Sequence, residues 1–77
     1  MPVFFFNFWD HKAYVPDPKG IELPGVSAVR EQALKSAREI LEDGRAQGDD
    51  RSAWRFDVKD GSDDTVLTMP FAEAASE

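Results

Sequence analysis

The chain has 77 residues, no cysteine and a formal net charge of −6, from nine lysines and arginines against fifteen aspartates and glutamates. A chain of this length forms one domain with a modest core, so we treat residues 1–77 as a single domain. The lack of cysteine excludes disulfides and zinc–thiolate sites and fits a reducing, cytoplasmic compartment. The acidic charge repels phosphate, and no segment approaches the roughly 20 apolar residues of a membrane span, so we expect no nucleic-acid or membrane partner.

Residues 3–9 read Val-Phe-Phe-Phe-Asn-Phe-Trp, an aromatic run that suits a pleated sheet better than a helix. Alternation along a strand separates these side chains into two faces. One face carries Phe4, Phe6 and Phe8, and the other carries Val3, Phe5, Asn7 and Trp9. A short return strand at 13–15 completes a hairpin over residues 3–15.

Residues 16–20 have turn chemistry, with two prolines and then a glycine. The segment 21–23 before Pro24 is extended, and it either lengthens the second strand or pins the loop to the core. Apolar residues at helical spacing then predict a helix over residues 26–46, with Val26, Val29 and Ile40 among its apolar stripe. Gly44 or Gly48 follows its last turn, and we favour Gly48 because 45–47 can continue the helix.

Residues 53–69 are predicted to form a second hairpin, because apolar and polar side chains alternate from Trp54 to Lys59 and a turn follows at 60–64. Residues 72–77 are expected to fray. The order is ββαββ, an α+β fold with a four-stranded antiparallel sheet and one helix packed on one face. The predicted core consists of Phe4, Phe6, Phe8, Val29, Ala33, Ala37, Ile40, Leu41, Trp54, Phe56, Val58, Leu67 and Met69, with Phe71 closing it.

Three stretches stand out as a set: Met1–Phe6, Gly20–Pro24 ahead of an alanine-rich helix, and Leu67–Phe71 with the sequence Leu-Thr-Met-Pro-Phe. Together they resemble a family of small bacterial domains of unknown function, frequent in rhizobia and related alphaproteobacteria. In that family a glycine usually sits later in the second hairpin turn than Gly61. The resemblance implies a fold and no activity.

Signatures of catalysis and metal binding are weak. The single histidine, His11, lies in a turn between an aspartate and a lysine. A histidine in a turn is more often a solvent-exposed residue without a catalytic role than a catalytic one. The acidic residues around Gly61 lack the spacing and the closing glutamate of an EF-type calcium loop. We therefore expect no catalytic residue, no metal and no cofactor, and we interpret this acidic stretch as a hairpin turn with solvated carboxylates at Asp57, Asp60, Asp63 and Asp64.

Two functions from different classes remain open. Removal of Met1 would leave Pro2 with a secondary amine, the general base of small tautomerases, but those enzymes run from their first strand to a helix. A hairpin and a proline-rich loop intervene here. We therefore favour a non-enzymatic binding or assembly module over an enzyme that uses Pro2.

The candidate interaction face consists of Val3, Phe5 and Trp9. One helix covers only one face of a sheet, and an uncovered aromatic patch usually marks an interaction site. The occupant is a second copy of the chain, giving a homodimer, or another protein. Alternatively, the C-terminal tail or the 21–23 segment folds over this face and leaves a monomer. Arg55, Asp57 and Lys59 are expected to share the face and make it mixed.

Overall fold

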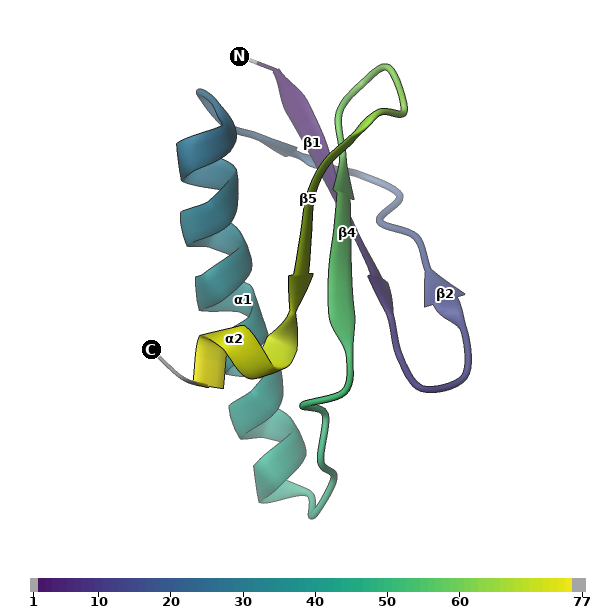
Figure 1. The fold of residues 1–77 in the computed structure, drawn as a ribbon, viewed down its shortest axis with the longest axis vertical. Helices are drawn as coiled ribbons and strands as arrows, with labels where there is room; N and C mark the ends of the chain where they lie inside the picture. Colours follow the sequence, from purple (N-terminus) through teal and green to yellow (C-terminus); the bar gives the residue numbers. More distant parts are fainter. Residues whose placement is uncertain (1, 76–77) are drawn as a thin grey trace.

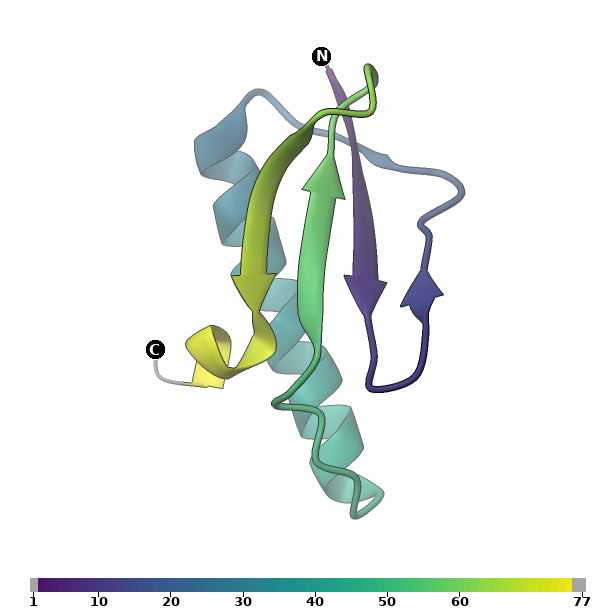
Figure 2. The ribbon, with the colours of Figure 1, turned by 45° about the vertical axis from the view of Figure 1, so that its right-hand side comes forward.

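A computed structural model describes residues 2–75 of the chain. Its elements are, in chain order, β1 (Val3–Trp9), β2 (Tyr14–Val15), β3 (Ile21–Glu22), α1 (Val26–Ala46), β4 (Arg55–Lys59), β5 (Thr65–Pro70) and α2 (Phe71–Ala75). The sheet is antiparallel in the order β2-β1-β4-β5, and α1 runs along one face of it (Figures 1 and 2). This arrangement confirms the predicted α+β class.

The sheet has five strands rather than the predicted four. Residues Ile21 and Glu22 pair with Phe4 and Val3 as β3, and the Leu23 N–H extends this pairing by donating to the Pro2 carbonyl at 3.0 Å. A strand of two residues shows no alternation in the sequence, so only its extended conformation before Pro24 was predictable.

β1 is a central strand, which explains why it is apolar on both faces. It pairs with β4 over five residues, with Phe6 opposite Val58 and Phe8 opposite Phe56. On its other edge Phe8 lies opposite Val15 of β2. Because both neighbours supply backbone partners, a seven-residue aromatic strand is held inside the sheet.

The helix α1 begins after Gly25 and ends with a glycine motif. Gly48, at φ 74°, follows the cap residue Gln47, and its N–H donates to the Arg45 carbonyl at 3.1 Å. Gly44 lies inside the helix and is buried, and the 48–52 loop passes so close that a Cβ there would lie 2.7 Å from the carbonyl oxygen of Asp49. The choice of Gly48 over Gly44 as the terminating glycine is therefore confirmed.

The helix stripe that faces the sheet is made of small and branched apolar residues: Val29, Ala33, Ala37, Leu41 and Gly44. Two residues of the predicted apolar stripe are less buried than expected. Val26 is 54% exposed, because it lies in the first turn, where the chain enters from an exposed segment, and Ile40 is only half-buried. The alanines let α1 approach the sheet closely.

The core between α1 and the sheet is rich in aromatic rings. Phe6 meets Phe56 edge-to-face at 5.9 Å between ring centroids, and Phe71 lies 4.7 Å from Phe56. Met69 and Phe71 are fully buried. Four predicted core residues pack at the margin and are only partly buried: Phe8, Ile40, Trp54 and Leu67.

Residues 72–75, which were expected to fray, form the end of α2, while residues 76 and 77 lie outside the described residues. Phe71 and Ala74 are buried, and the Phe71 N–H donates to the Trp54 carbonyl at 2.8 Å. Arg30 of α1 pairs with Glu73 of α2 at 2.9 Å, and α2 packs beside α1 (Figure 1). These tertiary contacts order a segment that is too short to be helical on its own.

Candidate interaction site

The sheet face opposite α1 carries the candidate interaction residues, and no helix within residues 2–75 covers it (Figure 2). The register of β1 and β4 places Trp9 opposite Arg55, Asn7 opposite Asp57 and Phe5 opposite Lys59. Directly opposite residues of an antiparallel pair point to the same face, so this open face is a mixture of aromatic, amide and charged side chains.

Three side chains form what we name the Trp9 cluster: Trp9, Tyr14 and Arg55. The Tyr14 ring lies 4.8 Å from the Trp9 ring, and the Arg55 guanidinium lies 5.4 Å from its centre. Trp9 remains 38% exposed. Pairing of Trp9 with Tyr14 on one side and Arg55 on the other holds the cluster on three adjacent strands.

Val3 and Phe5, the other predicted members of the face, are half-buried beneath the chain at Gly20. A Cβ at Gly20, whose φ is +74°, would lie 2.6 Å from Val3 Cγ1 and 3.0 Å from Phe5 Cε1. The loop after β2 therefore lies against these two side chains, and Trp9 is the exposed member of the predicted set.

Asp17 anchors that loop to the middle of β1. Its Oδ2 accepts the Phe6 N–H at 3.1 Å, and its Oδ1 accepts the Lys19 and Gly20 N–H groups at 3.2 Å each. The Asp17 N–H in turn donates to Asn7 Oδ1 at 2.8 Å. These hydrogen bonds occupy the part of β1 that lies between the residues paired with β3 and the residues paired with β2. The sequence indicated only a turn at Asp17.

A cleft of about 320 Å³ opens on the same face, beside the Trp9 cluster, and Tyr14 belongs to both. We name it the acidic cleft. Its lining combines two aromatic rings, one amide and three carboxylates, and consists of Phe5, Asn7, Tyr14, Pro16, Asp17, Asp60, Gly61 and Asp63. The sequence does not reveal this cleft, because the turns at 16–17 and 60–63 are far apart along the chain and meet only in the folded structure.

The turn at 60–64 is built by its own aspartates. Asp60 Oδ1 accepts the N–H groups of Ser62 and Asp64 at 2.8 and 3.1 Å, and Asp63 adopts a left-handed φ of 67°. Lys59 lies 3.7 Å from Asp63. Within residues 2–75 no group of three potential ligands is placed to hold a metal ion.

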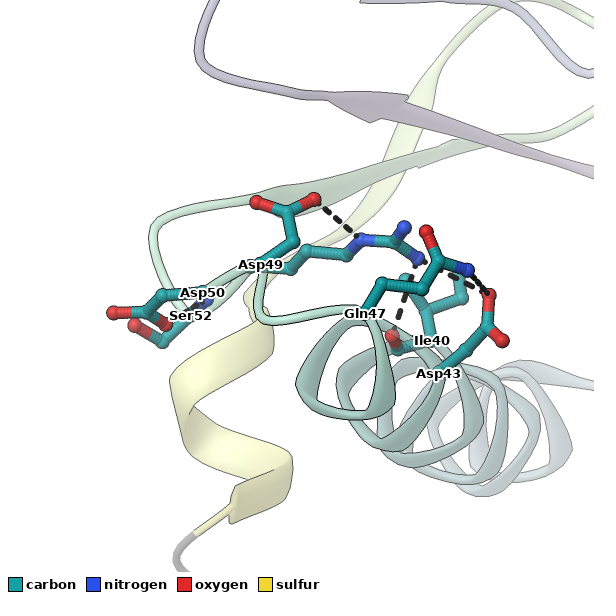
Figure 3. A network of polar contacts seen from close by, with 7 residues as sticks. Ile40, Asp43, Gln47, Asp49, Asp50 and Ser52 are labelled. Carbon is teal, nitrogen blue, oxygen red and sulfur yellow. Dashed lines mark hydrogen bonds and ion pairs between the residues drawn. The ribbon is translucent and has the colours of Figure 1, made fainter.

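A second cavity, of about 310 Å³, lies where α1 ends and the 48–52 loop turns back. Arg51 organises this region, which Figure 3 shows from close by. It donates to the Ile40 carbonyl at 3.4 Å, pairs with Asp43 at 3.5 Å and Asp49 at 3.0 Å, and lies 5.0 Å from the Trp54 ring centre. Its charge is matched within the fold, so this network has a structural role.

The residues considered for catalysis lie apart from both cavities. His11 is exposed in the turn between β1 and β2, where Asp10 accepts the Lys12 and Ala13 N–H groups at 2.7 and 2.6 Å. These bonds, from Lys12 first and Ala13 next, lower the pKa of Asp10. Pro2 is exposed, and it lines neither cavity.

These features define a class: a small α+β domain in which one long helix closes one face of an antiparallel sheet and leaves the other face open. No helix in residues 2–75 has the length and apolar character needed to cross a bilayer. Residues 3–72 match the model of a family described as a domain of unknown function, DUF6894, and the protein belongs to that family. Searches of curated proteins and of solved structures gave no match.

Proposed function

We propose that the protein is a small, non-enzymatic interaction module of the bacterial cytoplasm that binds another protein, or a second copy of itself, through the open sheet face. The Trp9 cluster carries this proposal. Tryptophan, tyrosine and arginine are the residue types that dominate binding energy at protein interfaces. Here one of each is brought together, and the tryptophan is 38% exposed.

The cluster is also pre-organised. Ring packing at 4.8 Å and the guanidinium contact at 5.4 Å restrict the three side chains before any partner arrives. Side chains that are already ordered lose less conformational entropy on binding. The cluster is therefore better suited to docking than an isolated exposed tryptophan.

The position of Pro2 gives less support to the alternative, an enzyme that uses an N-terminal amine. A general base at that position depends on burial to lower the pKa of its amine. Pro2 is exposed, and both cavities are lined by other residues. The binding role is supported by the exposed Trp9 cluster, whereas neither of the two cavities described for residues 2–75 includes Pro2.

Two measurements test the proposal together. The first is the mass by light scattering, at equal micromolar concentration, of wild type and Trp9→Glu, which is cleaner than Phe5→Glu because Phe5 packs against Gly20. The second is affinity capture with wild type, Trp9→Ala and Val26→Ala as baits, since Val26 is an exposed apolar residue on α1 and serves as the matched control.

We expect either a wild-type oligomer that Trp9→Glu dissociates, or a captured protein that Trp9→Ala loses at least about tenfold while Val26→Ala keeps it. A wild-type monomer whose captured proteins are the same for all three baits would show that the open face is not the binding surface.

A further inference from the structure

The acidic cleft lies where a partner docked on the Trp9 cluster would reach, because Tyr14 is shared by the cleft and the cluster. Its volume of about 320 Å³ is at the lower end of the range seen for ligand pockets. The cleft therefore has room for one side chain with some of its backbone, and its lining determines which side chain fits.

The charge of the lining has one sign. Asp17, Asp60 and Asp63 line the cleft, and no basic residue does. Lys59 contacts Asp63 at 3.7 Å, but the Asp63 carboxylate is 89% exposed, so this ion pair neutralises little of the charge. Asp57, opposite Asn7 on the same face, adds a fourth carboxylate nearby. Clefts lined by one sign of charge concentrate ions of the other sign.

Aromatic rings complete the chemistry for a cation. Phe5 and Tyr14 both contribute to the lining. The face of an aromatic ring attracts an ammonium or guanidinium group, and carboxylates beside it add a direct charge interaction. Rings and carboxylates in one cleft are the groups that select a lysine or arginine side chain.

Asn7 supplies an independent sign that the cleft takes a ligand. It is 94% buried, with only 6% of its surface exposed, and it lines the cleft. Its Oδ1 accepts the Asp17 N–H, which fixes the orientation of the amide and leaves Nδ2 as the donor. Within residues 2–75, Nδ2 has no hydrogen-bond partner and keeps contact with solvent.

We infer that the acidic cleft takes a lysine or arginine side chain from a basic segment of the partner protein, while Asn7 Nδ2 donates to a main-chain carbonyl of that segment. The inference rests on the proposed function and names the chemistry of the partner. A second copy of the chain, itself at −6, matches this charge less well than a basic partner does.

The test uses the ¹⁵N-labelled protein and two small probes, Nα-acetyl-lysine methylamide and its neutral isostere Nα-acetyl-norleucine methylamide, each titrated to about 50 mM so that even a millimolar site fills. Asn7 is the only asparagine of the chain, and its side-chain amide is told apart from those of Gln32 and Gln47 because it is attached next to a β rather than a γ methylene group. We expect the lysine probe to give saturable shifts at the Asn7 amide and at residues 60–63.

A charge variant sharpens the test. Asp63→Asn removes one carboxylate, and asparagine tolerates the left-handed φ of 67° at this position, so the turn is retained. Its affinity for the lysine probe should fall about threefold or more, which is what one exposed charge contributes. The spectrum of the variant outside residues 59–65 should be unchanged.

Equal shifts from both probes, shifts mapped outside the cleft, or no saturation with the lysine probe would each overturn the inference. These outcomes are separate from the failure of the proposed function, because the probes report on the cleft without a partner. A cleft that ignores lysine, combined with a capture that depends on Trp9, would reject the inference and leave the binding module in place.

Discussion

The central strand β1 contributes aromatic side chains to both faces of the sheet, but the two faces differ in how deeply these side chains are buried. On the helix side, Phe4 and Phe6 of β1 pack into a core in which Val29, Ala33 and Ala37 are completely buried. On the open side, β1 presents Trp9 among charged residues from β4 and leaves it exposed. The same strand therefore stabilises the fold through one face, while on the other face its Trp9 stays partly exposed.

This difference predicts a large loss of stability for Phe71→Ala. Phe71 is fully buried, and its ring lies 4.7 Å from Phe56 and 6.0 Å from Trp54. Removing a buried phenylalanine ring costs roughly 3–5 kcal/mol, which is a large part of the free energy of unfolding of a domain this small. Urea unfolding of wild type and variant measures the change, and a loss under about 1 kcal/mol would show that α2 is not part of the core.

An intermediate loss is expected for Asp17→Ala, which removes the anchor of the loop on the open side. The Phe6 N–H loses its acceptor, and leaving a backbone donor unpaired costs about 1–3 kcal/mol. The amide of Phe6 should exchange with solvent much faster, and hydrogen exchange by NMR measures it. Asp57→Ala is the matched control, and unchanged protection of Phe6 in Asp17→Ala would contradict the assigned role.

A small loss is expected for Trp9→Ala, in contrast to its expected effect on binding. Trp9 is partly exposed, and its ring lies against Tyr14 and Arg55 on the sheet face that the helix does not cover. Substitutions at such positions usually change the free energy of unfolding by less than about 1 kcal/mol. Urea unfolding beside Phe71→Ala compares the two faces directly, and equal losses would mean that both faces serve the fold alike.

The smallest effect concerns pH. The pKa of Asp10 is lowered from its ordinary 3.8 by the N–H groups of Lys12 and Ala13, so its carboxylate stabilises the folded chain. This contribution is complete above pH 3.8 and is lost as the pH falls through the lowered pKa of the folded state. An NMR titration of the Asp10 carboxyl should show a midpoint below 3.8, and a midpoint above 3.8 would contradict the turn geometry.

Periodicity predicted the parts of the fold that repeat. The helix over 26–46 and the alternation from Trp54 to Lys59 each carry several residues of consistent spacing. The two-residue β3 and the short α2 are too short to show a regular spacing of apolar residues. Each is ordered by contacts with distant segments: β3 with β1, and α2 with Trp54 and α1.

The candidate site shows the same division. Alternation grouped Val3, Phe5 and Trp9 on one face, and it also placed Arg55 on that face. It had no means of finding the Tyr14 neighbour of Trp9, since cross-strand neighbours depend on the register. The cleft was equally hidden, because Asn7, Asp17 and Asp60 are brought together only by folding.

The anchor at Asp17 has a consequence for the behaviour of the protein at high concentration. β1 is seven residues long, uncharged and free of proline and glycine, which is the composition of segments that assemble into cross-β fibrils. Such assembly needs backbone donors that are free to pair with another chain. By accepting the Phe6 N–H, Asp17 occupies one such donor in the middle of the strand. The loop after β2 thus makes this donor in the middle of β1 unavailable for pairing with another chain.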